Sequence, residues 1–262
     1  MKFAPVALFV YKRLEHLQKV VFSLQKNELS SNSDLIIFSD GSKNNEDASR
    51  VLAVREYLKS ISGFKSIGII ERESNIGLAN SIIQGVSEVL NSYDRVIVME
   101  DDLVVSPFFL NFMNDSLTLY ENEEKVGSIH GYVYPIKQLL PETFFIKGAD
   151  CWGWGTWKRA WQHFESDGEK LLKGIKERKA EKEFDLDNSY PYLRMLKDQI
   201  KGKNDSWAIR WHASLFLKEI LTLYPGKSFV QNIGLDDSGT HTKTTDSFDT
   251  LFVSGYEGIR KT

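Results

Sequence analysis

The feature that most constrains the fold is an alternation of short apolar runs and amphipathic stretches over the first 100 residues. The apolar runs are rich in Val, Ile and Phe, are bounded by turn residues or charges, and are typical of buried strands. They are Val6–Tyr11, Leu35–Ser39, Ile67–Glu71 and Arg95–Met99. Between them, apolar residues at three-to-four spacing predict helices at Leu14–Gln25, Glu46–Ile61 and Ile76–Leu90. This alternation predicts an α/β fold with a parallel sheet, in which ligands bind at the carboxyl ends of the strands.

The second half is predicted to be mainly helical and rich in aromatic residues. Its expected elements are short strands at Gly127–His130, Phe144–Ile146, Leu223–Pro225 and Phe229–Gln231, an aromatic loop at Ala149–Trp157, and helices at Glu169–Phe184 and Ser206–Leu221. No linker divides residues 1–235, so we expect one domain with halves at 1–125 and 126–235. From residue 236 to residue 262, Gly, Ser, Thr and Asp dominate at first, which predicts a flexible tail.

Composition excludes some classes of function. The net charge is −3 over 262 residues, which gives no indication of nucleic-acid binding. Cys151 is the one cysteine, so neither an intrachain disulfide nor a cysteine metal cluster can form, and a reducing compartment is expected. The apolar run at Val6–Tyr11 is too short for a membrane span or a signal peptide. We therefore expect a cytoplasmic protein, either free or peripheral to the inner face of the membrane.

Three consecutive carboxylates, Glu100, Asp101 and Asp102, directly follow the fourth predicted strand. Unpaired carboxylates beside a core are costly, so packing does not explain them. Mg²⁺ and Mn²⁺ prefer oxygen ligands and typically take one or two carboxylates together with substrate phosphates. We interpret the triplet as a site for a metal ion and a diphosphate, in preference to a solvated loop.

Polar residues also follow the other three predicted strands. Tyr11 and Arg13 offer a ring that could stack on a base and a cation for phosphate. Asp40 lies in Ser39–Ser42, where it either accepts from a base or ribose, or forms a tight Asp-Gly turn. After the third strand, Arg72 to Ala79 contains Asn75 and Gly77, which suit a turn beside a ligand or an ordinary strand-to-helix turn.

Taken in order, Ser39–Ser42, Arg72–Ala79 and Glu100–Leu110 resemble the corresponding motifs of GT-A glycosyltransferases. The triplet and its flanks are similar to the metal-binding stretch of Golgi N-acetylglucosaminyltransferases that start complex N-glycans, and the order is also similar to bacterial family-two sugar transferases. The resemblance covers the first half and parts of the second. It implies a Rossmann-like, mostly parallel sheet flanked by helices, with the acceptor side in the second half.

The resemblance also implies roles by position. Asp102 would be the direct ligand of Mn²⁺ or Mg²⁺, and Asp40 would recognise a base, which the resemblance implies is uracil. The residues expected to contact the nucleotide-sugar are Tyr11, Arg13, Asp40, Arg72, Asn75, Glu100 and Asp101. His241, in the polar tail, would close over the metal or diphosphate as histidines do in some similar enzymes, or else lie in a surface loop.

The acceptor side is expected around the aromatic loop. Trp152 and Trp154 stand beside glycines, which gives flat rings that sugars can stack on, and His130 ends a predicted strand that would border the same cleft. An inverting transfer needs a carboxylate to take the proton of the acceptor hydroxyl. The resemblance favours Asp205, beside a tryptophan, although Asp205 also suits the N-cap of the following helix. Asp150 is the second candidate.

These observations predict a metal-dependent, inverting glycosyltransferase that uses a nucleotide-sugar donor, most simply UDP-GlcNAc or a UDP-hexose. The acceptor would be a glycan or lipid-linked glycan in surface polysaccharide synthesis. One alternative is a sugar-nucleotide pyrophosphorylase, but the chain lacks a glycine-rich phosphate loop near Val10–Arg13. Another is a binding scaffold that keeps the fold without turnover. The sequence does not choose the donor sugar.

Overall fold

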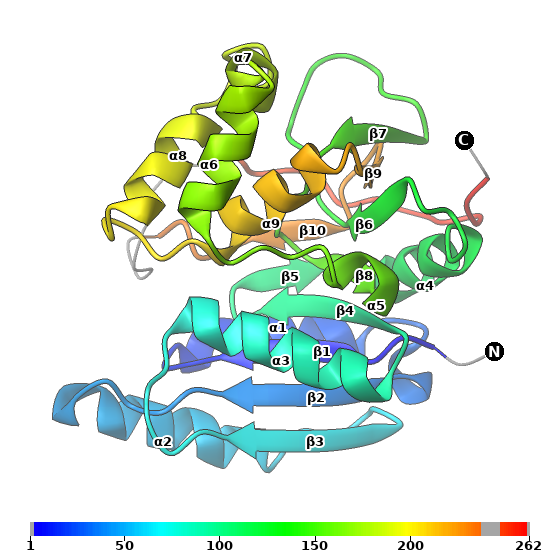
Figure 1. The fold of residues 1–262 in the computed structure, drawn as a ribbon. Coiled ribbons are helices and arrows are strands. Elements are labelled where there is room, and N and C mark those ends of the chain that lie inside the picture. Colours follow the sequence, from blue (N-terminus) through cyan, green and yellow to red (C-terminus); the bar gives the residue numbers. More distant parts are fainter. Residues whose placement is uncertain (1–2, 237–246, 261–262) are drawn as a thin grey trace.

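The computed structural model of the chain describes residues 3–236 and 247–260 (Figure 1). Its centre is an eight-stranded sheet with the order β3-β2-β1-β4-β8-β6-β9-β7, and a second, two-stranded sheet pairs β10 with β5. The strands are β1 (Val6–Val10), β2 (Asp34–Ser39), β3 (Ser66–Glu71), β4 (Arg95–Glu100), β5 (Leu103–Val105), β6 (Val126–His130), β7 (Thr143–Lys147), β8 (Trp154–Trp157), β9 (Leu221–Pro225) and β10 (Val230–Asn232).

The first four strands are parallel, as predicted. β1 lies between β2 and β4, and β3 pairs with the far side of β2. The crossovers are the helices α1 (Leu14–Gln25), α2 (Asn45–Leu58) and α3 (Leu78–Ser92), with a 3-10 turn, η1, at Ser30–Asn32. Figure 1 shows α3 in front of this part of the sheet and α1 behind it. Because β1 to β4 run the same way, the residues that follow them meet at one edge.

The second half extends the same sheet with both strand directions. β8 runs antiparallel to β4 and β6, β6 and β9 are parallel, and β7 closes the edge antiparallel to β9. Parallel neighbours outnumber antiparallel ones, which confirms a mostly parallel sheet. The prediction of a loop throughout Ala149–Trp157 is wrong, because its last four residues form β8. Since β6 is parallel to β4, the carboxyl end of β6 lies at the same edge as the acidic triplet.

Helices cover both halves of the sheet. In the second half they are α4 (Phe109–Leu119), α5 (Lys158–Trp161), α6 (Gly168–Glu177), α7 (Glu181–Phe184), α8 (Tyr192–Ile200) and α9 (Trp207–Leu217). The predicted single helix at Glu169–Phe184 is broken between α6 and α7, where Lys179 has a positive φ of 54°. A small core of apolar side chains, among them Leu171, Phe184 and Ile209, joins α6, α7, α8 and α9 beside the main core.

The described part of the C-terminal segment, residues 247–260, has no helix or strand but packs on the domain. Tyr132 donates its hydroxyl proton to Phe248 O over 2.8 Å, and Val253 N donates to Ser228 O over 3.0 Å. The ring of Tyr256 packs edge-on against Phe112. Within the described ranges, every helix is too short or too polar to cross a lipid bilayer.

Candidate active site

The acidic triplet lies where β4 ends. Glu100 is the last residue of β4, and Asp101 and Asp102 form the turn into β5. The Arg13 guanidinium binds both aspartates: Nε donates to Asp101 Oδ1 over 3.1 Å, and Nη2 donates to Asp101 Oδ1 and, over 2.7 Å, to Asp102 Oδ2. Tyr11 N donates to Asp101 Oδ2 over 3.3 Å. The ends of β1 and β4 therefore meet, as the strand pattern predicts.

The charges of this cluster suit a cation. Three carboxylates share one guanidinium, and burial together with the charges of Asp102 and Asp101 raises the pKa of Glu100 to about 8. Among residues 3–236 and 247–260, no three His, Cys, Asp or Glu side chains are arranged to hold a metal by themselves. Mg²⁺ and Mn²⁺ commonly complete their shells with substrate phosphates and water. The described residues therefore do not form a closed metal site, and an ion at Asp102 would need further ligands from a bound diphosphate and water.

A segment C-terminal to β10, which no predicted site residue marks in the sequence, closes one side of the cluster. Ile233 N donates to Asp102 O over 2.8 Å. A Cβ at Gly234 would lie 2.3 Å from Asp102 Oδ2, so a larger residue there would displace that carboxylate. His16 Nε2 and Asp236 Oδ2 are 3.0 Å apart and hold the end of the segment to α1. These contacts join residues more than 100 positions apart, and only Gly234 itself carries a local signal.

The hydrogen-bonding capacity of the Asp40 carboxylate is largely used by neighbouring residues. Its side chain is 5% exposed. Oδ1 accepts from Gly41 N over 2.9 Å and from Ile76 N over 3.0 Å, and Oδ2 accepts from Asn75 Nδ2 over 3.0 Å and from Gly77 N over 3.1 Å. Residues 40–42 form no tight turn, and the carboxylate instead fixes the loop that leads into α3.

Arg72 lies beneath that loop. Its guanidinium stacks over the Phe38 ring, 5.8 Å from the centroid, and Nη1 lies 3.4 Å from Gln84 Oε1. Its Nε and Nη2 are buried and have no hydrogen-bond partner among the described residues. Buried donors of this kind are rare in proteins. Two nitrogens of the Arg72 guanidinium are therefore unpaired and buried next to the Phe38 ring.

The Tyr11 ring is held in place at the end of β1. Its hydroxyl donates to Asp47 Oδ2 over 2.9 Å and accepts from Lys43 N over 3.0 Å. Lys12 Nζ donates to the other oxygen of Asp47 over 2.7 Å. Asp47 thus holds Tyr11, which the sequence suggests for nucleotide binding, together with the neighbouring Lys12, and Asp47 is not itself a predicted site residue.

Two buried histidines fix the loop that carries Asp150. His130 Nε2 accepts from Trp152 N over 3.1 Å, and His212 Nδ1 lies 2.8 Å from Ala149 O. Burial lowers the pKa of both imidazoles, so both are neutral near pH 7. The prediction that His130 borders the acceptor cleft is wrong in this structure, because its side chain is only 1% exposed. His130 instead supports the loop through its hydrogen bond with Trp152 N.

Tyrosines surround the Asp150 carboxylate. Tyr134 OH donates to Asp150 Oδ2 over 3.2 Å. Burial and the negative charge of Asp150 raise the pKa of Tyr134, Tyr190, Tyr192 and Tyr224, so these phenols keep their protons.

Cys151 connects this loop to the acidic triplet. Its backbone N donates to Asp150 Oδ1 over 2.9 Å. Burial, followed by the charges of Asp150, Glu100 and Asp102, raises the pKa of the Cys151 thiol well above its usual value. The loop that carries Asp150 and Cys151 precedes β8, which runs antiparallel to β4, so it lies at the same edge of the sheet as the triplet.

The two tryptophans of the aromatic loop have different environments. Trp152 is half-buried and packs edge-on against Tyr132 and Phe248, with centroids 4.7 and 5.7 Å apart. Trp154 lies on β8, is fully buried, and stacks on Trp207 with centroids 5.3 Å apart. The prediction that Trp154 binds sugar is wrong in this structure, because core side chains surround its ring.

Asp205, the other predicted base, lies at the start of α9. Its carboxylate accepts from Arg210 Nη2 over 3.2 Å, and its side chain is 65% exposed. The expectation that it caps the helix is wrong: Ser206 is the N-cap, and its Oγ accepts from Ile209 N over 3.2 Å. The predicted metal ligand His241 lies outside the described residues.

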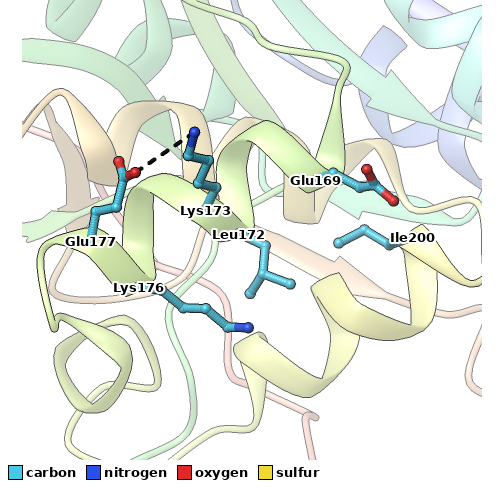
Figure 2. Close-up of a pocket in the computed structure, with 6 residues that line it drawn as sticks. All are labelled: Glu169, Leu172, Lys173, Lys176, Glu177 and Ile200. Carbon is cyan, nitrogen blue, oxygen red and sulfur yellow. Dashed lines mark ion pairs between the residues drawn. The ribbon is translucent and has the colours of Figure 1, made fainter.

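Two cavities bounded by described residues lie away from the acidic triplet. One, of about 400 Å³, opens on the outer surface between α6 and α8 (Figure 2) and is lined by Glu169, Leu172, Lys173, Lys176, Glu177 and Ile200. The other, of about 550 Å³, lies between the loop at residues 136–143 and the C-terminal segment at residues 253–259. Neither contains a residue of the predicted site.

Comparison with known proteins gives matches among solved structures only. No family model and no curated protein matches the chain. The structures it resembles are glycosyltransferases. One is the mannosyltransferase PcManGT from Pyrobaculum calidifontis in complex with GDP-Man and Mn²⁺, with 13% identity, a TM-score of 0.34, and coverage of 51% of this chain and 36% of that one. Another is S. aureus TarS in complex with UDP-GlcNAc, with 15% identity, a TM-score of 0.36, and coverage of 54% and 37%.

A further structure of S. aureus TarS matches with 12% identity and a TM-score of 0.37 over 66% of this chain and 49% of that chain. This chain thus spans between a third and a half of the length of these proteins. A likeness of this size identifies neither a donor nor an acceptor, so the function proposed below depends on the chain's own residues.

Proposed function

We propose that the chain is a metal-dependent glycosyltransferase of the GT-A type that moves a sugar from a nucleoside-diphosphate sugar to a glycan hydroxyl. The observation that carries the proposal is the carboxylate triplet at the end of β4, bound by Arg13 and enclosed by the segment around Gly234. A second carboxylate, Asp150, lies at the same sheet edge. Such an arrangement supplies a place for a diphosphate and, at the same edge of the sheet, a carboxylate that can act as general base.

The donor would bind along the ends of β1 to β4. A divalent cation at Asp102 would neutralise the diphosphate as it leaves. Arg13 holds Asp101 and Asp102 in a fixed orientation, and Arg72 offers unpaired N–H groups to an anion. Tyr11, with its hydroxyl anchored, would present its ring to the base, for which we propose uracil. The loop that Asp40 and Asn75 hold would border the nucleotide, and Glu100 would lie near the ribose or sugar.

We assign the general base to Asp150. Two histidines fix its loop, and the charges of Glu100 and Asp102 contribute to the raised pKa of the neighbouring Cys151 thiol. Asp150 would accept the proton of the acceptor hydroxyl as that oxygen attacks the anomeric carbon, which gives inversion. Asp205 is bound by Arg210 and exposed, and it is the second candidate. We further propose that the enzyme works at the cytoplasmic side of the membrane on a glycan or lipid-linked glycan.

A turnover assay tests this proposal. The purified chain is incubated with UDP-GlcNAc, UDP-Glc, UDP-Gal or GDP-mannose, with Mn²⁺ or a chelator, and with a panel of glycan acceptors, and release of the nucleoside diphosphate is measured. We expect release from one donor that requires Mn²⁺. Formation of a nucleoside triphosphate from donor and pyrophosphate would instead identify a pyrophosphorylase, and donor binding without turnover would identify a binding scaffold.

The same assay separates the two candidate bases. Asp150→Asn should lower kcat by roughly 10²–10⁴-fold with little change in the apparent affinity for the donor, because proton transfer contributes a factor of this size. Asp205→Asn should change kcat only a few-fold. The reverse ranking would assign the base to Asp205 and remove the role given to the Asp150 loop.

A further inference from the structure

Two exposed tyrosines lie near the Asp150 carboxylate. Tyr134 follows β6 and is 39% exposed, and Tyr190 precedes α8 and is 44% exposed. Tyr134 contacts the carboxylate directly, and Tyr190 is linked to the Asp150 loop through Tyr192 and His212. Neither residue was singled out from the sequence, because the segments that carry them are more than 50 positions apart.

Contacts with neighbouring side chains hold both tyrosines in place. Tyr134 OH donates to Asp150 Oδ2 over 3.2 Å. The Tyr190 ring lies 4.6 Å from the Tyr192 ring, and Tyr192 in turn stacks on His212, with centroids 4.3 Å apart and planes 23° apart. His212 is the histidine that fixes the Asp150 loop. The exposed faces are therefore supported by the same contacts that position the carboxylate.

The carboxylate retains capacity for a ligand. In the contacts with described residues, Oδ1 accepts from Cys151 N, Oδ2 accepts from Tyr134 OH, and the Cys151 thiol also hydrogen-bonds to the carboxylate. A carboxylate can accept about four hydrogen bonds, so capacity for a further donor remains. A sugar ring matches this surface, because its C–H face packs on the negative face of an aromatic ring while its hydroxyl protons point outward to acceptors.

We propose that Tyr134, Tyr190 and Asp150 form the acceptor subsite and that the acceptor ends in a pyranose ring, which lies against the two tyrosines with a hydroxyl directed to Asp150. This inference rests on the proposed function and deepens it, because it assigns the residues that hold the terminal ring of the acceptor glycan and the group that its hydroxyl faces. It also moves the acceptor platform from the tryptophans to the tyrosines.

Saturation-transfer NMR tests the subsite without knowledge of the natural acceptor. The probes are the methyl glycosides of glucose, galactose, N-acetylglucosamine and mannose, added to the chain in the presence of UDP or GDP and Mn²⁺, with irradiation of the aromatic protons. The variants are Tyr190→Ala and Tyr190→Phe, and Leu139→Ala, which removes a fully exposed apolar side chain elsewhere, is the matched control.

We expect saturation of the protons of at least one glycoside in the wild type, in Tyr190→Phe and in the control, and a decrease of about tenfold in affinity in Tyr190→Ala, which is the size of one aromatic contact. Equal saturation in Tyr190→Ala overturns the subsite, and so does the absence of saturation by any glycoside when nucleotide binds. Nucleotide binding is followed separately in the same samples. Its absence would overturn the proposed function, and the acceptor role with it.

Discussion

Replacement of Asp40 by Asn separates a structural role of this residue from a role in base recognition. Each carboxylate oxygen accepts two N–H groups: Gly41 N and Ile76 N bind Oδ1, and Asn75 Nδ2 and Gly77 N bind Oδ2. An Asn side chain has the same shape, but its NH₂ group must face one of these two pairs. Either orientation therefore leaves two N–H groups without an acceptor.

The cost follows from this count. Leaving a buried donor unsatisfied costs about 1–3 kcal/mol, so two donors cost about 2–6 kcal/mol of the free energy of unfolding. For a domain of this size, about 1 kcal/mol lowers Tm by roughly 2–4 °C. We therefore expect Asp40→Asn to lower Tm by at least about 4 °C, because the loop before α3 loses its anchor.

The assay is thermal unfolding followed by circular dichroism, combined with titration of UDP and Mn²⁺ by calorimetry. The matched control is Asp187→Asn, whose side chain is 84% exposed and which should change stability by less than about 0.5 kcal/mol. A Tm for Asp40→Asn within about 1 °C of the wild type, together with a loss of UDP affinity, would refute the structural reasoning and show that the carboxylate serves the nucleotide.

Three further predictions concern the loop and the wall of the site. Trp154→Ala should lower the free energy of unfolding by about 3–5 kcal/mol in urea denaturation, because its ring is fully buried, whereas Trp152→Ala should cost less than about 2 kcal/mol; equal costs would contradict the assignment of Trp154 to the core. His130 and His212 have pKa values below the ordinary 6.5, so the unfolded chain binds more protons in acid than the folded chain does. Tm should therefore fall as the pH drops below about 6.5, and a His212→Asn variant should show a shallower fall. A pH-independent Tm would contradict burial of neutral imidazoles. Gly234→Ala should weaken Mn²⁺-dependent nucleotide binding at least about tenfold in calorimetry with an unchanged circular dichroism spectrum, and unchanged affinity would show that the segment does not enclose the site.

The first half of the fold follows from local sequence because each strand and helix there is a continuous periodic segment. The predicted helix at Leu14–Gln25 is observed with the same bounds, and the strand ends bring Arg13 to the triplet. Parallel sheets bury both faces of a strand, so their strands appear as uninterrupted apolar runs. Position along the chain was therefore enough to place the candidate donor residues.

The second half was harder to predict because its elements depend on distant partners. β8 contains a glycine between two tryptophans, a composition typical of a loop, yet Gly155 suits the strand because a Cβ there would lie 2.9 Å from Met113 Cε and 3.2 Å from Val96 O. The same composition predicts an exposed loop for Trp154. The environment of Asp150 depends on His212, which lies 62 positions along the chain, so no local pattern shows what surrounds Asp150.

Helix boundaries show a smaller failure of the same kind. Asp205 and Ser206 are adjacent residues, and both are good N-caps, so sequence does not choose between them. The structure has Ser206 as the cap and leaves Asp205 bound to Arg210. This distinction is a single position in sequence, but it decides whether the Asp205 carboxylate caps the helix or pairs with Arg210.

The most direct test of the central claim is calorimetric titration of UDP and of GDP into the wild-type chain and into Asp102→Asn, each with Mn²⁺ and with a chelator. We predict that one nucleotide binds the wild type with Mn²⁺. Either the chelator or the substitution should weaken this binding at least about tenfold, while the circular dichroism spectrum stays the same. Binding of the nucleotide with equal affinity by Asp102→Asn, or binding that the chelator does not change, would contradict the assignment of the triplet as a metal and diphosphate site.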